Sequence, residues 1–181
     1  MTQRAERPTI AGVVLAGGQS QRMGRDKAGI DYLGQTFLDR AQALLKTVGC
    51  APVLVSGRPE LPGGIPDQTP EQGPALSMLD SMSAITGQCD GVLFVPVDMP
   101  LLESADLLPL LSSPHGLSRA WTKYPLPVFL SIRQDLPPRT DVRSVKYLLS
   151  CLEMDWLDLP PDRGVNFSNV NSPEELTKLS H

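Results

Sequence analysis

The sequence has few of the residues that build zinc sites, disulfide frameworks or nucleic-acid interfaces. Its 181 residues include three cysteines and two histidines, and no C-x-x-C pair occurs. The odd number and wide spacing of the cysteines are typical of reduced thiols and make a zinc site unexpected. The net charge of −4 at pH 7 gives no reason to expect a nucleic-acid partner.

Long apolar runs are also absent. The first apolar stretch, Ile10–Ala16, is too short to cross a membrane, and no secretory signal is visible. We therefore expect a cytoplasmic protein without a membrane partner. The composition, with 41% hydrophobic and 20% charged residues, is ordinary for a globular protein. A chain of this length is predicted to form a single domain over residues 1–181, with residues 1–9 as a flexible lead-in.

The most informative stretch runs from Leu15 to Lys27 and reads LAGGQSQRMGRDK. It follows a short β-branched run that is typical of a buried strand. Glycines let backbone N–H groups approach a ligand, and the basic side chains add positive charge, so the stretch indicates a polyphosphate site. The glycine spacing matches neither a Walker A loop nor the G-x-G-x-x-G fingerprint. Two glycines alone would also fit a plain tight turn.

Apolar runs alternate with amphipathic segments along the chain. This alternation predicts βαβ units and a Rossmann-like, three-layer α/β sandwich with a mostly parallel sheet. The segment 58–74 contains five prolines and is predicted to be irregular. Strands are expected over 10–15, 52–56, 91–97, 117–121, 125–132 and 154–159, and helices over 36–48 and 75–86, from Ser104, from a cap at Asp141 and from Ser172.

Ligands of open α/β sheets bind beside the carboxyl ends of the strands. The first three predicted strands end at the glycine-rich stretch, at Ser56-Gly-Arg58 and at Asp98, so these segments are expected to face one crevice. Asp98 is a candidate magnesium ligand, because Mg²⁺ takes one or two carboxylates together with phosphate oxygens. Taken alone, Asp98 also fits a turn aspartate, and Lys27 also fits a solvated surface lysine.

Residues 15–27 closely resemble the signature loop of the NTP transferases that make molybdenum cofactor guanine dinucleotide. Asp98-Met-Pro100, and Asn169-Val-Asn171 followed by Ser-Pro-Glu-Glu, resemble two further motifs of these molybdenum cofactor guanylyltransferases. The resemblance implies the nucleotidyltransferase fold and transfer of GMP from GTP to the terminal phosphate of molybdenum-molybdopterin, with release of pyrophosphate. It also implies Mg²⁺ as cofactor and partner proteins that deliver molybdopterin or mature molybdoenzymes.

The resemblance assigns roles to individual residues. Catalysis would depend on Lys27, Asp98 and Arg22, with Asp98 as the magnesium ligand. Ser56 stands where many relatives have an asparagine. The asparagines also fit a loop before a helix, and Arg143 also fits an exposed helix arginine. The positions expected to bind nucleotide or pterin are Leu15, Ala16, Gly17, Gly18, Lys27, Ser56, Asp67, Gly73, Asp98, Arg143, Asn169 and Asn171.

This reaction needs no general base. The nucleophile is a phosphate monoester whose second pKa is about 6, so it is largely dianionic at neutral pH. In keeping with this, no histidine lies near any of the motifs. Two other functions stay open at this point. One is a related nucleotidyltransferase that uses CTP or another phosphorylated acceptor, such as a sugar or cobinamide. The other is a non-catalytic nucleotide-binding protein.

Overall fold

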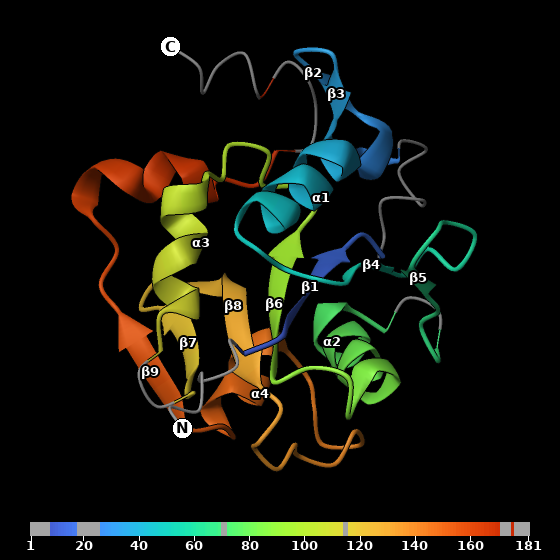
Figure 1. Cartoon of the computed structure of the whole chain (residues 1–181), viewed down its shortest axis with the longest axis vertical. Helices are drawn as coiled ribbons and strands as arrows, with labels where there is room; N and C mark the ends of the chain where they lie inside the picture. The colour runs from blue at the N-terminus through green and yellow to red at the C-terminus, as the bar shows by residue number, and fades with distance from the viewer. Residues whose placement is uncertain (1–7, 18–25, 70–71, 114–115, 171–174, 176–181) are drawn as a thin grey trace, which may run out of the picture.

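A seven-stranded sheet forms the middle of the computed structural model, which describes residues 8–17, 26–69, 72–113, 116–170 and 175 (Figure 1). Its order is β5–β4–β1–β6–β8–β7–β9, and among these strands only β8 runs against its neighbours. The predicted mostly parallel sheet is therefore confirmed. The strands are β1 (Ile10–Leu15), β4 (Val53–Ser56), β5 (Gly64–Ile65), β6 (Gly91–Pro96), β7 (Ser118–Trp121), β8 (Tyr124–Ser131) and β9 (Met154–Leu157).

Helices cover both faces of this sheet, which confirms the predicted three-layer arrangement (Figure 1). Helices α1 and α3 pack on one face, where Phe37 and Leu107 are fully buried, and α2 and α4 pack on the other, where Met78 and Leu148 are fully buried. No helix in the described ranges is both long and apolar enough to cross a membrane. The helices are α1 (Phe37–Thr47), α2 (Pro74–Ile85), α3 (Ser104–Leu111) and α4 (Val145–Ser150).

The segment between β1 and α1 contains more regular structure than the sequence indicated. The sequence favours a short extended piece with a turn over 28–34, but the chain first forms a 3₁₀ turn, η2 (Lys27–Gly29). A small hairpin of β2 (Asp31–Tyr32) and β3 (Gln35–Thr36) follows. Helix α1 begins as predicted, because the Thr36 hydroxyl accepts a hydrogen bond from the Asp39 N–H at 3.0 Å.

Two local expectations were wrong. Asp141 does not cap α4; the helix starts three residues later than that cap implied, where the Ser144 hydroxyl accepts the Tyr147 N–H at 3.2 Å. The proline-rich segment 58–74 is not wholly irregular either, since Gly64–Ile65 pairs with β4. Prolines 62 and 66 flank this pair, so neither removes an N–H from it.

The register of the sheet decides where the site lies. Leu15, the last residue of β1, is level with Ser56 on one side and with Pro96 on the other. The residues that follow β1, β4 and β6 therefore leave the sheet at one edge. As the sequence predicted, this edge carries Gly17, Gly57 and Asp98.

Candidate functional site

Lys27 and Asp98 meet at this edge of the sheet although 71 positions separate them in sequence. The Lys27 Nζ donates to Asp98 Oδ2 at 3.1 Å, and both side chains are about three-quarters buried. Asp98 is the second residue after β6, and Lys27 is the first residue of η2. The predicted pair is thus brought together, with a cation and a carboxylate side by side at the rim of the sheet.

The ends of β1 and β4 touch through their backbones. Gly57 has φ +80°, and a Cβ built there would lie 2.5 Å from the Gly17 Cα. A Cβ on Gly17 would in turn lie 2.9 Å from Asp67 Oδ2. Gly57 therefore needs glycine for its backbone angle and for space, whereas a side chain at Gly17 would displace the Asp67 carboxylate and crowd the Gly57 Cα at 3.2 Å. This packing brings the Asp67 carboxylate against the start of the glycine-rich stretch.

Ser56 is buried next to Asp67 and is not exposed at the edge of the sheet. Its side chain is fully buried, and its hydroxyl donates to Asp67 Oδ1 at 3.5 Å. Asp67 itself is half-buried. Of the two predicted binding residues, Asp67 is the one whose carboxylate can reach a ligand, while Ser56 orients it.

Arg58 is a residue at this edge to which the sequence reasoning gave no role. Its guanidinium donates from Nε to the Ala16 carbonyl at 3.4 Å and from Nη2 to the Asp26 carboxylate. Its side chain is 13% exposed. The hydrogen bond with Asp26 is the largest cause of a raised Arg58 pKa, and burial opposes it. The signal was its place directly after a predicted strand end, at Ser56-Gly-Arg58.

The late asparagine motif reaches the same edge. The Val170 N–H donates to the Asp98 carbonyl at 2.8 Å, and Val170 is fully buried while Asn169 beside it is exposed. The sequence suggested this motif, but nothing in its spacing placed it beside Asp98. The Val170 backbone contact thus places Asn169 one residue away from a contact with Asp98.

The buried Asp106 carboxylate holds in place the residues that precede Asn169. A 3₁₀ helix, η3 (Pro161–Phe167), precedes it. From this helix Arg163 Nε donates to Asp106 Oδ1 at 2.8 Å, and Asn166 donates to Asp106 Oδ2 at 3.0 Å. Asp106 is 1% exposed, and its hydrogen bond is the largest cause of a raised Arg163 pKa. Helix α3, which carries Asp106, therefore holds the chain on its way to Asn169.

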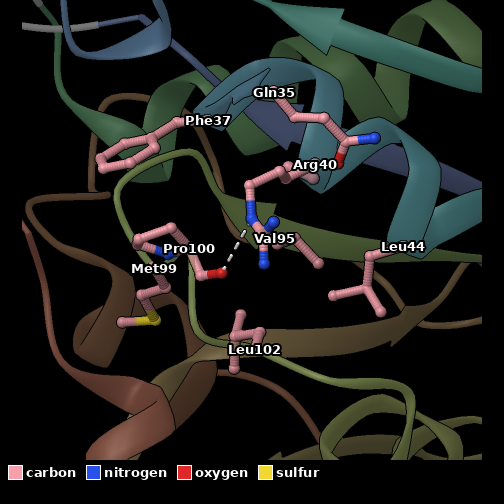
Figure 2. A pocket seen from close by; sticks show the side chains of 9 residues that line it. Gln35, Phe37, Arg40, Leu44, Val95, Met99, Pro100 and Leu102 are labelled. Carbon is pink, nitrogen blue, oxygen red and sulfur yellow. Dashed lines mark hydrogen bonds between the residues drawn. The ribbon is translucent and has the colours of Figure 1, made fainter. Parts of the chain in front are cut away.

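A pocket of about 170 Å³ lies between α1 and the chain that follows β6 (Figure 2). The side chain of Arg40 reaches across it and donates from Nε to the Pro100 carbonyl at 3.3 Å. Arg40 also lies over the Tyr32 ring at 4.9 Å. Apart from Arg40 and Gln35, the side chains that line the pocket are apolar, and neither Asp98 nor Lys27 lines it. The contact ties α1 to the turn after Asp98. The residues that line it are Gln35, Phe37, Arg40, Ala41, Leu44, Val95, Met99, Pro100 and Leu102.

The other predicted site residues divide into four groups. Leu15 ends β1 and Ala16 follows it, and the Ala16 N–H donates to the Ser56 carbonyl at 3.2 Å. Gly73 caps α2 with φ +84°. Arg143 is exposed two residues before α4, and no contact within the described chain joins it to Lys27 or Asp98. Three predicted residues lie outside the described ranges: Gly18, Arg22 and Asn171.

Known sequences match this chain along most of its length. The MobA-like NTP transferase domain matches residues 12–133. The molybdenum cofactor guanylyltransferase of Xanthomonas euvesicatoria pv. vesicatoria (strain 85-10) is 38% identical over 179 residues, which cover 94% of each chain. The chain belongs to the MobA-like NTP transferase family. The match from 12 to 133 includes Lys27 and Asp98, and the longer alignment accounts for nearly all of the chain.

Solved structures share the fold of this chain. Molybdopterin-guanine dinucleotide biosynthesis protein A from Archaeoglobus fulgidus superposes with a TM-score of 0.67 at 17% identity, covering 93% of this chain and 96% of the other. Rv0371c from Mycobacterium tuberculosis, solved as a complex with manganese, gives 0.60 at 14% identity, covering 94% and 97%. At these identities the similarity concerns the arrangement of helices and strands.

A divalent cation is typical of NTP transferases, and Asp98 fits one. Its Oδ2 is bound by Lys27, and no hydrogen bond from the described residues reaches Oδ1. The same part of the chain contains no cluster of three or more histidine, cysteine, aspartate or glutamate side chains. A cation here would therefore draw its remaining ligands from phosphate oxygens and water, which is how proteins commonly hold Mg²⁺.

Proposed function

We propose that this MobA-like NTP transferase moves GMP from GTP to the terminal phosphate of molybdenum-molybdopterin and releases pyrophosphate. The product would be the molybdopterin guanine dinucleotide cofactor. The observation that supports this most directly is the Lys27–Asp98 pair at the carboxyl edge of the sheet, in a chain 38% identical to a molybdenum cofactor guanylyltransferase. We further propose Mg²⁺ as the cation and Asp98 as its protein ligand.

The side chains at this edge would act through charge and position. Lys27 would neutralise negative charge on the triphosphate, most strongly as pyrophosphate leaves. A cation held by Asp98 would polarise the phosphoryl oxygens. The acceptor phosphate is largely ionised at neutral pH, so the proposed reaction needs no general base. The chain's contribution is then to align the acceptor phosphate with the α-phosphate of the nucleotide.

The remaining edge residues would recognise the two substrates. Asp67, oriented by Ser56, lies beside Gly17 and is proposed to contact the nucleotide. Asn169 is exposed next to the backbone of Asp98, where an amide would reach either substrate. Arg143 would face the pterin phosphate. Its exposed position agrees with this assignment, but no contact in the described chain adds support.

Pyrophosphate release from GTP, CTP and ATP, each with molybdenum-molybdopterin as acceptor, tests the proposal. With Mg²⁺ present, GTP should be turned over in preference to the other two, and a chelator should stop the reaction. Lys27→Met should lower kcat/KM by roughly 10- to 150-fold, which corresponds to one hydrogen bond to a charged group. Lys46→Met is the matched control, because Lys46 is an exposed lysine in the last turn of α1.

Unfolding measurements separate a catalytic defect from a folding defect. Lys27 and Asp98 form one ion pair at the rim, with 24% and 21% of their side chains exposed. Its loss should change the free energy of unfolding by no more than about 1 kcal/mol. Preference for CTP would instead indicate a related cytidylyl enzyme. The absence of pyrophosphate release with every nucleotide and every phosphorylated acceptor, sugar and cobinamide included, would favour a non-catalytic nucleotide-binding protein.

A further inference from the structure

Arg58 bonds to one residue near each end of the glycine-rich stretch 15–27. Its Nε donates to the carbonyl of Ala16, the first residue after β1, at 3.4 Å. Its Nη2 donates to the carboxylate of Asp26, the residue before η2. Ala16 and Asp26 are separated from Arg58 by 42 and 32 positions. One guanidinium at the end of β4 therefore spans the start and the finish of that stretch.

Asp26 connects Arg58 to the 3₁₀ turn η2, which begins with Lys27. The same oxygen that binds Arg58 also accepts the Ala28 N–H at 3.1 Å and so caps η2. The Asp26 carbonyl accepts the Gly29 N–H at 3.1 Å. Lys27 begins this short turn and extends its Nζ to Asp98. The direction in which Lys27 points therefore depends on how the Asp26 carboxylate is held.

A plain surface ion pair would look different. Arg133 and Asp90 form such a pair at 3.7 Å, with 75% and 46% of their side chains exposed. Asp26 is as exposed as Asp90, at 46%, so the difference lies in the arginine. The Arg58 side chain is 13% exposed, and it also lies 3.6 Å from the Glu60 carboxylate. The planar fork of arginine can bond to several acceptors in fixed directions, which a lysine ammonium on its flexible stem cannot reproduce. Burial and three separate partners indicate a structural link between segments.

We infer that Arg58 is a positioning residue that ties the two ends of the glycine-rich stretch together and thereby sets Lys27 against Asp98. Its effect on turnover rests on the proposed nucleotidyl transfer. Its effect on η2 does not, because every bond of the link joins two residues of this chain. Arg58 would therefore influence the reaction through Asp26 and Lys27.

Hydrogen exchange of the substrate-free protein tests the link itself. Arg58→Met should speed exchange of the amides of η2, Ala28 above all, by about tenfold, the equivalent of one hydrogen bond to a charged group. Arg133→Met should leave these amides unchanged, because its guanidinium pairs with Asp90 at the opposite edge of the sheet. Unchanged exchange in Arg58→Met would overturn the inference, whatever the enzyme assay shows.

Steady-state kinetics test the consequence for Lys27. Arg58→Met should lower kcat by roughly 10- to 100-fold with a smaller rise in KM for GTP, since misplacing a catalytic group affects mainly the reacting complex. Asp26→Asn should act in the same direction, and the double variant should be no worse than Arg58→Met. Arg58→Lys should recover part of the loss, because it keeps one contact.

Two kinetic results would contradict the inference. Independent, multiplying effects of Arg58→Met and Asp26→Asn would mean that Arg58 does not act through Asp26. A rise in KM alone would mean that Arg58 holds the triphosphate directly. If the unmodified protein transfers no nucleotide at all, the proposed function fails, and hydrogen exchange still decides whether Arg58 fixes η2.

Discussion

Replacing Gly57 by alanine should force apart the ends of β1 and β4. A Cβ on Gly57 would lie 2.5 Å from the Gly17 Cα and 2.8 Å from the Gly17 nitrogen, and both are backbone atoms. The left-handed backbone at Gly57 costs an L-residue about 1–2 kcal/mol, and overpacking adds about 1–3 kcal/mol. Alanine also restricts the unfolded chain, which offsets about 0.4–1 kcal/mol. We expect the free energy of unfolding to fall by about 2–4 kcal/mol.

Gly49→Ala separates the cost of the backbone angle from that of the close contact. Gly49 has φ +91°, but a Cβ there would meet nothing within 4 Å. It follows α1, outside the site. Its substitution should therefore cost about 1 kcal/mol, the left-handed penalty less the unfolded-state gain. Urea unfolding followed by the fluorescence of Trp121, which is 4% exposed, would measure both variants.

Gly57→Ala should also impair nucleotide transfer. Gly57 can accept a side chain only if Gly17 moves away, and this movement shifts the start of the glycine-rich stretch relative to Asp67. A displacement of about 1 Å can cost up to about 100-fold in rate, so we expect a loss of roughly 10- to 100-fold. Equal unfolding costs for Gly57→Ala and Gly49→Ala, with unchanged transfer, would refute the reasoning from the close contact.

Two further predictions concern the thiols and the start of α4. Burial raises the pKa of Cys50 to about 12 and also raises that of Cys89, so a thiol reagent at about pH 8 should label the exposed Cys151 well before either. Because an unfolded cysteine titrates near about pH 8.5, the stability contributed by neutral Cys50 should be complete below that pH and decline as pH rises toward about 12, which urea unfolding at about pH 7 and pH 10 would detect. Ser144→Ala should cost about 1 kcal/mol through loss of the helix cap, while Asp141→Ala should cost little; the reverse order would contradict the observed cap.

Local patterns in the sequence predicted most of the fold. The β-branched run before Leu15, the cap at Thr36 and the apolar run before Asp98 correspond to β1, α1 and β6. The errors came where two local signals compete. Asp141 and Ser144 are both good cap residues, and packing of the apolar face of α4 against the sheet decides between them. β5 is two residues long, too short for any period to be visible.

The candidate site was predictable in its residue types and in the strand ends that carry them. Parallel strands share a carboxyl edge, so Lys27, Ser56 and Asp98 were expected to gather there, and the structure confirms that Lys27 and Asp98 meet. The role of Arg58 was not predictable. An arginine after a strand is equally compatible with solvent, and its acceptors on Ala16 and Asp26 are defined by folding.

By itself, the sequence determined the family, the alternation of strands and helices, and the chemistry available at the strand ends, because these depend on neighbouring residues and on motif spacing. The tertiary structure decided which of those groups touch. It placed the backbone of Val170 on Asp98, seated Ser56 beneath Asp67, and joined Asp26 to Arg58. These contacts connect positions far apart in the chain, and their distances follow from how the helices and strands pack, which no local pattern encodes.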